Sequence, residues 1–147
     1  KVKLHIRGDG PMKDEIDAMI RAEGIEQQVS FFGRLTMEEM RDFIRTSHVI
    51  VSSSYVETFG VSIAEGMACG KPVVATISGG PEDYVTPQSG ILVPAGNSAA
   101  LANAMQRIVT EYDRFDPRVV RQVCVDQFSE LALVRHLESI YNVVTKK

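Results

Sequence analysis

The sequence predicts an α/β fold, built on a doubly wound parallel sheet with helices on both faces. Short apolar runs alternate with amphipathic segments along the chain, and this alternation indicates βαβ units. The runs are apolar at consecutive positions, which is typical of strands buried on both faces of a parallel sheet. Turn residues, often glycine, follow the runs.

The first two predicted strands flank a helix. Polar and apolar side chains alternate over residues 1–6, which predicts a strand from the first residue. Apolar residues then recur at helical spacing over residues 12–20. The apolar run Val29–Phe32 predicts the second strand, which Gly33 ends.

The middle of the chain continues this alternation. Thr36 and Glu39 form a capping-box motif, which predicts the start of a second helix. The β-branched run His48–Ser52 predicts a strand. Residues 58–69 predict a helix that ends at Gly70.

Two more strands and three more helices complete the predicted domain. The strands are expected at residues 72–75 and 90–93, and the helices at residues 101–112, at 118–127 and after a cap at Ser129. No repeat or internal linker interrupts residues 1–147, so a single domain is expected.

The composition excludes several classes of protein. The chain has 147 residues, of which 44% are hydrophobic and 24% charged, close to the globular average. The net charge is −3 and basic residues form no run, so nucleic acid is not an expected partner. Cys69 and Cys124 have no metal-site spacing and are too few for a disulfide scaffold. No leader pattern or membrane-spanning stretch is visible, so a cytoplasmic location is expected.

A ligand is expected at the loops that follow the strands, because open parallel sheets bind ligands beyond the carboxyl ends of their strands. Four of the five loops contain glycine, which lets backbone amides approach a ligand closely. The loops are Gly8–Pro11, Gly33–Leu35, Ser53–Phe59, Ser78–Pro81 and Pro94–Gly96.

Two glutamates stand out within a segment poor in charge. Residues 55–81 contain only three charged residues, Glu57, Glu65 and Lys71, and are expected to be largely buried. Eight helical residues rise ~12 Å, which is more than the ~5–9.5 Å between the acids of a glycosidase. The glutamates therefore suit two contacts along an extended polar ligand, and the helix start near residues 60–62 could accept a phosphate.

Each glutamate also has a purely structural interpretation. Ser54 and Glu57 match a capping box, and Glu65 fits an exposed position on a helix. For either residue taken alone, the structural and the ligand-binding interpretation both stay open, and the flanking sequence is needed to distinguish them.

The segment Ser54–Ala75 resembles the signature of the retaining glycosyltransferases of family four, the glycosyl transferases group 1. That signature is a glutamate, seven residues, a second glutamate, and then Ala-x-Gly-x-Pro-Val-Val-Ala. Here Glu57 and Glu65 are followed by ACGKPVVA at residues 68–75. Further family motifs occur in order as GDGP at residues 8–11, VSFFG at 29–33, SGGPE at 78–82 and GILV at 90–93.

The resemblance implies a Rossmann-like C-terminal domain of the two-domain GT-B architecture, which binds a nucleotide diphosphate sugar. It implies that Glu57 is the catalytic residue, in contact with hydroxyls of the transferred sugar, and that Glu65 binds the ribose. The main-chain N–H groups of Phe59, Gly60 and Val61 would bind the sugar and phosphates of the donor.

The resemblance assigns further donor contacts to other loops. Gly33, Arg34 and Leu35 would border the nucleobase, Gly8 and Gly10 would line the cleft, and Gly79 and Gly80 would lie near the sugar together with Glu82. The family uses no metal and no cofactor besides its sugar-nucleotide substrate, because positive groups and helix ends stabilise the leaving diphosphate.

The chain departs from the family pattern chiefly in what it lacks. The family's phosphate-contacting Arg and Lys, in an upstream strand–helix unit, are absent, and so is the N-terminal domain that binds most of the acceptor. Residues 1–147 are therefore expected to be a domain truncated at its N-terminal side and inactive alone. Any membrane association would reside in the missing part. His48 stands where the family commonly has Asp, which indicates local variation rather than a catalytic base.

Two other classes stay open. One is a sugar-nucleotide epimerase or hydrolase domain on the GT-B fold, which would need other active-site acids and histidines. The other is a non-catalytic, flavodoxin-like nucleotide-binding or interaction module. A receiver domain of that type would need an acidic pair after its first strand and an Asp ending a central strand.

The donor's base and sugar are left open, as is the choice among polysaccharide, lipid-linked and small-molecule acceptors.

Overall fold

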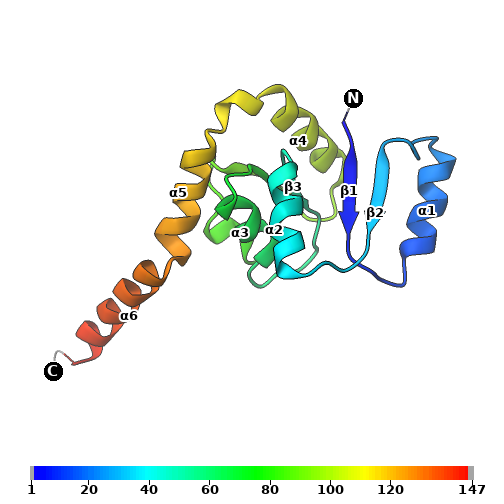
Figure 1. Ribbon diagram of the computed structural model, residues 1–147. Helices are drawn as coiled ribbons and strands as arrows, with labels where there is room; N and C mark the ends of the chain where they lie inside the picture. The colour runs from blue at the N-terminus through cyan, green and yellow to red at the C-terminus, as the bar shows by residue number, and fades with distance from the viewer. Residues whose placement is uncertain (1, 146–147) are drawn as a thin grey trace. The chain divides into compact units, whose positions relative to one another are not determined.

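The computed structural model of the chain describes residues 2–145 (Figure 1). Parallel strands alternate with helices along the sequence, which confirms the predicted α/β fold class. The chain divides into two compact units, Lys1–Met40 and Arg41–Lys147, and each contains a parallel ladder of its own.

The first unit is built around two parallel strands. β1 (Leu4–Arg7) pairs with β2 (Val29–Phe32) along its whole length, and α1 (Lys13–Ala22) connects them. β2 has the predicted bounds, whereas β1 begins at Leu4; the first residue of the predicted strand lies outside the described residues. No side chain of residues 2–40 is fully buried, so the apolar groups of this unit keep part of their surface exposed.

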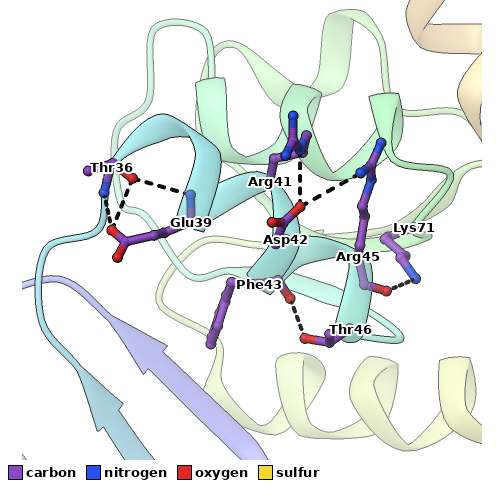
Figure 2. A network of polar contacts seen from close by, with 8 residues as sticks. All are labelled: Thr36, Glu39, Arg41, Asp42, Phe43, Arg45, Thr46 and Lys71. Carbon is purple, nitrogen blue, oxygen red and sulfur yellow. Dashed lines mark hydrogen bonds and ion pairs between the residues drawn. The ribbon is translucent and has the colours of Figure 1, made fainter.

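α2 (Met37–Thr46) begins at the predicted capping box (Figure 2). The Thr36 amide donates to Glu39 Oε2 at 2.8 Å, and the Glu39 amide donates to Thr36 Oγ1 at 3.3 Å. Reciprocal bonds of this kind satisfy amides that a helix start leaves without intrahelical acceptors. The bond from the Thr36 amide is the main cause that lowers the pKa of the Glu39 carboxyl.

The other end of α2 is also capped. Lys71 Nζ donates to the Arg45 carbonyl oxygen at 2.8 Å (Figure 2). The carbonyls at the last turn of a helix carry partial negative charge, and a cation placed there is stabilising. Lys71 therefore has a structural partner at the end of this helix.

The second unit contains a three-stranded parallel sheet. Its strands lie in the order β3 (Ile50–Ser52), β4 (Val73–Ile77) and β5 (Gly90–Pro94). All four residues Val73–Thr76 of the central strand are buried. Consecutive buried positions require cover on both faces of the sheet, which agrees with the apolar runs in the sequence.

Besides the end of α2, four α-helices belong to the described part of the second unit. α3 (Val61–Ala68) packs against β3 and β4, and α4 (Ser98–Thr110) packs against β4 and β5. α5 (Pro117–Phe128) packs against α3, and α6 (Glu130–Thr145) extends from the end of α5 away from the sheet (Figure 1). The core includes Ile63, Met67, Val73, Val74, Ala75, Ala104, Ile108 and Val120.

Several predicted helix boundaries differ from the structure by one to three residues. α3 begins at Val61 rather than at residue 58, because Gly60 takes a left-handed conformation, with φ 85°, directly before the helix. A residue with that conformation cannot continue a right-handed helix backwards. Likewise, Tyr112 lies beyond α4, in a short 3₁₀ helix. The predicted cap at Ser129 is confirmed, since its hydroxyl accepts from the Ala132 amide at 3.2 Å.

Among residues 2–145, no helix is both long enough and apolar enough to cross a membrane.

The two cysteines are free thiols, with Cys69 half-buried and Cys124 buried. Cys124 Sγ donates to the Ala64 carbonyl oxygen at 3.4 Å. That thiol is therefore part of the packing between α3 and α5.

Candidate functional site

The loops that follow β3 and β4 are joined through their main chains. The Glu57 amide donates to the Ser78 carbonyl oxygen at 2.9 Å, and the Gly80 amide donates to the Glu57 carbonyl oxygen at 2.7 Å. Glu57 and Gly79 form an isolated parallel bridge. This pairing fixes the first signature glutamate against the glycine pair of the next loop.

The glycine pair permits this close approach. A Cβ atom on Gly80 would lie 2.6 Å from Phe59 Cα and 2.7 Å from Phe59 N. A Cβ atom on Gly79 would lie 2.9 Å from the Glu57 carbonyl oxygen. Contacts below 3.0 Å with backbone atoms cannot be relieved by moving a side chain, so both positions need glycine.

The Glu57 side chain is half-buried and turned toward its own loop. Its Oε1 atom accepts a hydrogen bond from the Phe59 amide at 3.2 Å. The Phe59 amide, which the family resemblance assigns to the donor, is therefore engaged by Glu57 in this structure. A donor that takes this amide would have to replace the carboxylate.

The start of α3 presents further backbone amides. The Gly60 carbonyl oxygen accepts from the amides of Ile63 and Ala64 at 2.9 and 3.1 Å. The amides of Val61 and Ser62 have no intrahelical acceptor, because they belong to the first turn. A helix start of this kind carries partial positive charge and suits a phosphate or another anion.

Glu65 lies closer to the start of α3 than predicted. It is the fifth residue of the helix, little more than one turn from Val61, and those four steps rise ~6 Å. The predicted helix start at residue 58 would place Glu65 two turns inside the helix; this placement was wrong, because α3 begins at Val61. The Glu65 side chain is half-buried, and among residues 2–145 its carboxylate has no hydrogen-bond or ion-pair partner.

Tyr84 and Phe128 belong to the same site, and sequence reasoning missed both. The Tyr84 hydroxyl donates to the Phe59 carbonyl oxygen at 2.6 Å, with the Gly60 carbonyl oxygen at 3.1 Å. The Phe59 ring packs on Tyr84 and Phe128, with centroids 5.7 and 5.0 Å away. For Tyr84, the only sequence signal was its position two residues after Glu82. For Phe128, which ends a distant helix, there was no sequence signal.

Glu82 is held by its own loop. Its carboxylate accepts hydrogen bonds from the amides of Ser78 at 3.1 Å and Gly79 at 2.9 Å. Hydrogen bonds from backbone amides, its own first, lower the pKa of this carboxyl against an opposing effect of burial. Glu82 therefore shapes the turn that carries the glycine pair.

In the first unit, the predicted residues lie in two adjoining loops. The Gly8 amide donates to the Phe32 carbonyl oxygen at 3.2 Å, which holds the loop after β1 beside the end of β2. Arg34 Nε lies 3.7 Å from Asp9 Oδ2, and both side chains are mostly exposed. The structure therefore brings Gly8 and Gly10 close to Gly33, Arg34 and Leu35 within this unit.

The signature segment is less buried than expected. The middle of its helix and most of the following strand are buried, but Tyr55 is 77% exposed and Val56 81% exposed. Val61 is also mostly exposed. The low charge of this segment therefore marks two different environments: a core in α3 and β4, and an exposed apolar and polar loop before α3.

Within residues 2–145, no three His, Cys, Asp or Glu side chains gather as a metal site would require. The candidate site contains two carboxylates and a set of backbone amides. The amides lie at the start of α3, and the carboxylates are those of Glu57 and Glu65.

A parallel α/β fold with strand-end loops and a free helix start is the architecture of many nucleotide-binding proteins. The chain belongs to the glycosyl transferases group 1 family, which it matches over residues 1–119. Family membership confirms the resemblance found in the sequence.

Individual relatives agree with this assignment. The chain is 36% identical over 103 residues to a D-inositol 3-phosphate glycosyltransferase of Streptomyces bingchenggensis, covering 69% of this chain and 23% of that protein. Sucrose-phosphate synthase from Thermosynechococcus elongatus matches 97% of this chain and 38% of its own, with 29% identity and a TM-score of 0.81.

A third similar protein is a mutant of TarM from S. aureus, in complex with fondaparinux, alpha-GlcNAc-glycerol and UDP. It is 26% identical, with a TM-score of 0.82, over 96% of this chain and 29% of its own. The chain therefore spans well under half the length of each of these proteins, from 23% to 38%.

Proposed function

We propose that this chain is the donor-binding domain of a retaining glycosyltransferase of hexosyltransferase type. The observation that carries the proposal is the joined pair of loops at Glu57 and Gly79, which places a carboxylate beside the amides of the α3 start. Family membership supports a glycosyltransferase. The UDP bound by the similar TarM mutant supports a nucleotide diphosphate sugar as donor.

The proposed reaction transfers a sugar to an acceptor hydroxyl with the anomeric configuration kept. The bond between the sugar's anomeric carbon and the diphosphate oxygen breaks, and a bond from that carbon to the acceptor oxygen forms. Negative charge grows on the leaving diphosphate as that bond breaks, and an oxygen of the diphosphate takes the proton of the acceptor hydroxyl. Backbone amides at Gly60 and Val61 would stabilise that charge electrostatically, so no metal is proposed.

The site residues divide by the part of the donor that they would bind. Glu57 would orient the hydroxyls of the transferred sugar, with Gly79 and Gly80 beside it. Glu65, whose carboxylate has no partner among the described residues, would bind the ribose hydroxyls. The exposed loops with Gly8, Gly10, Gly33, Arg34 and Leu35 would serve the rest of the nucleotide.

We further propose that residues 1–147 act as one nucleotide-sugar-binding domain of a longer enzyme. A second, N-terminal domain would bind most of the acceptor and supply any membrane association. The chain's small share of its relatives' lengths supports this division. Alone, the chain should bind nucleotide weakly and transfer no sugar. The enzyme would act in the cytoplasm, where nucleotide sugars are available.

A titration of the chain with UDP, GDP and ADP, followed by heteronuclear NMR, tests the proposed function. Amide shifts concentrated in residues 57–66 and 33–35 are expected for a transferase donor site. Shifts elsewhere, or none with any of the three nucleotides, would favour the flavodoxin-like interaction module instead. Robust sugar transfer by the purified chain would contradict the proposed division of labour.

In the longer enzyme, Glu65→Ala tests the ribose contact. Loss of a charged hydrogen-bond acceptor should raise the donor KM by about 10- to 100-fold. Glu138→Gln, on the exposed surface of α6, is the matched control and should leave donor KM unchanged. Unchanged donor kinetics in Glu65→Ala would contradict the assignment.

A further inference from the structure

The Gly60 amide, directly before α3, belongs to a peptide whose orientation the backbone alone does not fix. Gly60 has φ 85°, a conformation that glycine adopts about as easily as its mirror image. A peptide that precedes such a glycine can rotate at little cost, and rotation would reverse the direction of its N–H group. Something outside the loop must hold the Phe59–Gly60 peptide in one orientation.

The Tyr84 hydroxyl is placed to do this. It donates to the Phe59 carbonyl oxygen at 2.6 Å, and the Gly60 carbonyl oxygen lies 3.1 Å away. The Gly60 oxygen already accepts from two helix amides, so the Phe59 oxygen is the main acceptor. In a planar trans peptide, the N–H group points opposite to the carbonyl, and the structure contains no cis peptide among its described residues.

We propose that Tyr84 is a positioning residue for the donor site: by holding the Phe59 carbonyl, it directs the Gly60 amide of the same peptide away from itself, to the side where a diphosphate would bind. The inference rests on the proposed function. Tyr84 acts through the backbone and touches no part of the donor in this scheme.

Tyr84 is itself held rigidly. It is 2% exposed, and its ring packs edge-on against Phe128 with centroids 5.1 Å apart. Burial above all, and then the negative charge of Glu57, raises the pKa of Tyr84 to about 12. The hydroxyl therefore keeps its proton, and remains a donor, at neutral pH.

The position of Gly60 agrees with this role. A Cβ atom at residue 60 would lie 2.7 Å from the Tyr84 hydroxyl oxygen. The hydroxyl therefore occupies the space next to the glycine, where a larger residue would displace it. Tyr84 and Gly60 act as a pair, in which the glycine allows the turn and the tyrosine selects its orientation.

Tyr84→Phe in this chain tests the inference, since it removes the hydroxyl and keeps the ring. The affinities for UDP and for uridine are measured by calorimetry, with Tyr112→Phe as the matched control. Loss of one hydrogen bond should weaken UDP binding by about 5- to 10-fold and leave uridine binding unchanged. A general loss of folding would instead weaken both ligands equally, which would overturn the inference.

A second readout needs no ligand. In the free protein, the Gly60 amide signal of Tyr84→Phe should broaden or double, as the Phe59–Gly60 peptide samples two orientations, and that of Tyr112→Phe should not. Single sharp signals in Tyr84→Phe would overturn the inference. If the wild-type chain binds UDP no better than uridine, the proposed diphosphate site fails, and the amide signals still decide the role of Tyr84.

Discussion

At Gly80, the backbone of the neighbouring loop occupies the space that a side chain would need. The glycine has an ordinary right-handed backbone conformation, so conformational freedom is not the reason for its presence. The reason is the Phe59 main chain, which lies within 2.7 Å of the position of a Cβ atom. Glycine is required here by packing alone.

Gly80→Ala should therefore destabilise the chain by about 1–3 kcal/mol, the usual range for overpacking. The free energy of unfolding can be measured by urea denaturation. Gly10→Ala is the control, because nothing lies within 4 Å of its Cβ position, and its effect should stay within about 0.5 kcal/mol. Equal effects of the two substitutions would contradict the close packing of the loops.

Glu82 makes the turn after β4 sensitive to acid. Its folded-state pKa lies below the ordinary value of 4.5, because backbone amides donate to the carboxylate. A lowered pKa stabilises the fold above the ordinary pKa, and this contribution is lost as the pH falls through the folded-state value. The stability difference between wild type and Glu82→Gln should therefore be greatest near neutral pH and shrink in acid. A difference independent of pH would contradict this prediction.

Several site residues were predictable from sequence, and others were not. The two signature glutamates and the glycine pair stand in a local pattern, so their positions along the chain could be read directly. Tyr84 and Phe128 reach the same loop from 25 and 69 residues beyond Phe59. Contacts over such separations depend on the fold, which no local pattern contains.

Among the helices and strands, α2 is the one whose start the sequence predicts most clearly. The Thr36 and Glu39 bonds appear as predicted because both partners lie within one helical turn. Thr36→Ala should cost about 1 kcal/mol of unfolding free energy, measured by thermal denaturation. Thr36→Ser keeps the hydroxyl and should cost much less; similar losses for both would contradict the cap.

α3 shows why element boundaries are harder to predict. The residues before it are apolar enough to continue the helical pattern, and so the predicted start was three residues early. The tertiary pairing of Glu57 with Gly79 takes the preceding residues into a bridge instead. Strand interiors were easier, because consecutive apolar residues at Val73–Ala75 leave few alternatives.

On the scale of the whole molecule, burial differs sharply between the two units. Residues 73–76 of β4 are buried, whereas no side chain of residues 2–40 is. Local stability follows buried apolar contact. The amides of β1 and β2 should therefore exchange with deuterium at least about 10-fold faster than those of β4, measured by native-state hydrogen exchange. Equal protection in both units would contradict this expectation.

The α/β class followed from the alternation of elements, which depends only on short-range pattern. The division into units at Met40 did not, because it cuts through a helix that the sequence pattern leaves continuous. The position of such a boundary depends on contacts between residues that are far apart in the sequence, and a local pattern does not contain these contacts.

The pairing between the loops at Glu57 and Gly79 has a practical consequence for protein engineering. Its hydrogen bonds join main-chain atoms, so the geometry does not depend on which side chains the neighbouring exposed positions carry. Val56 and Thr58 flank Glu57 and are both exposed. A mutant library randomised at these two codons would alter the chemical surface of the candidate site while the scaffold beneath it stays in place.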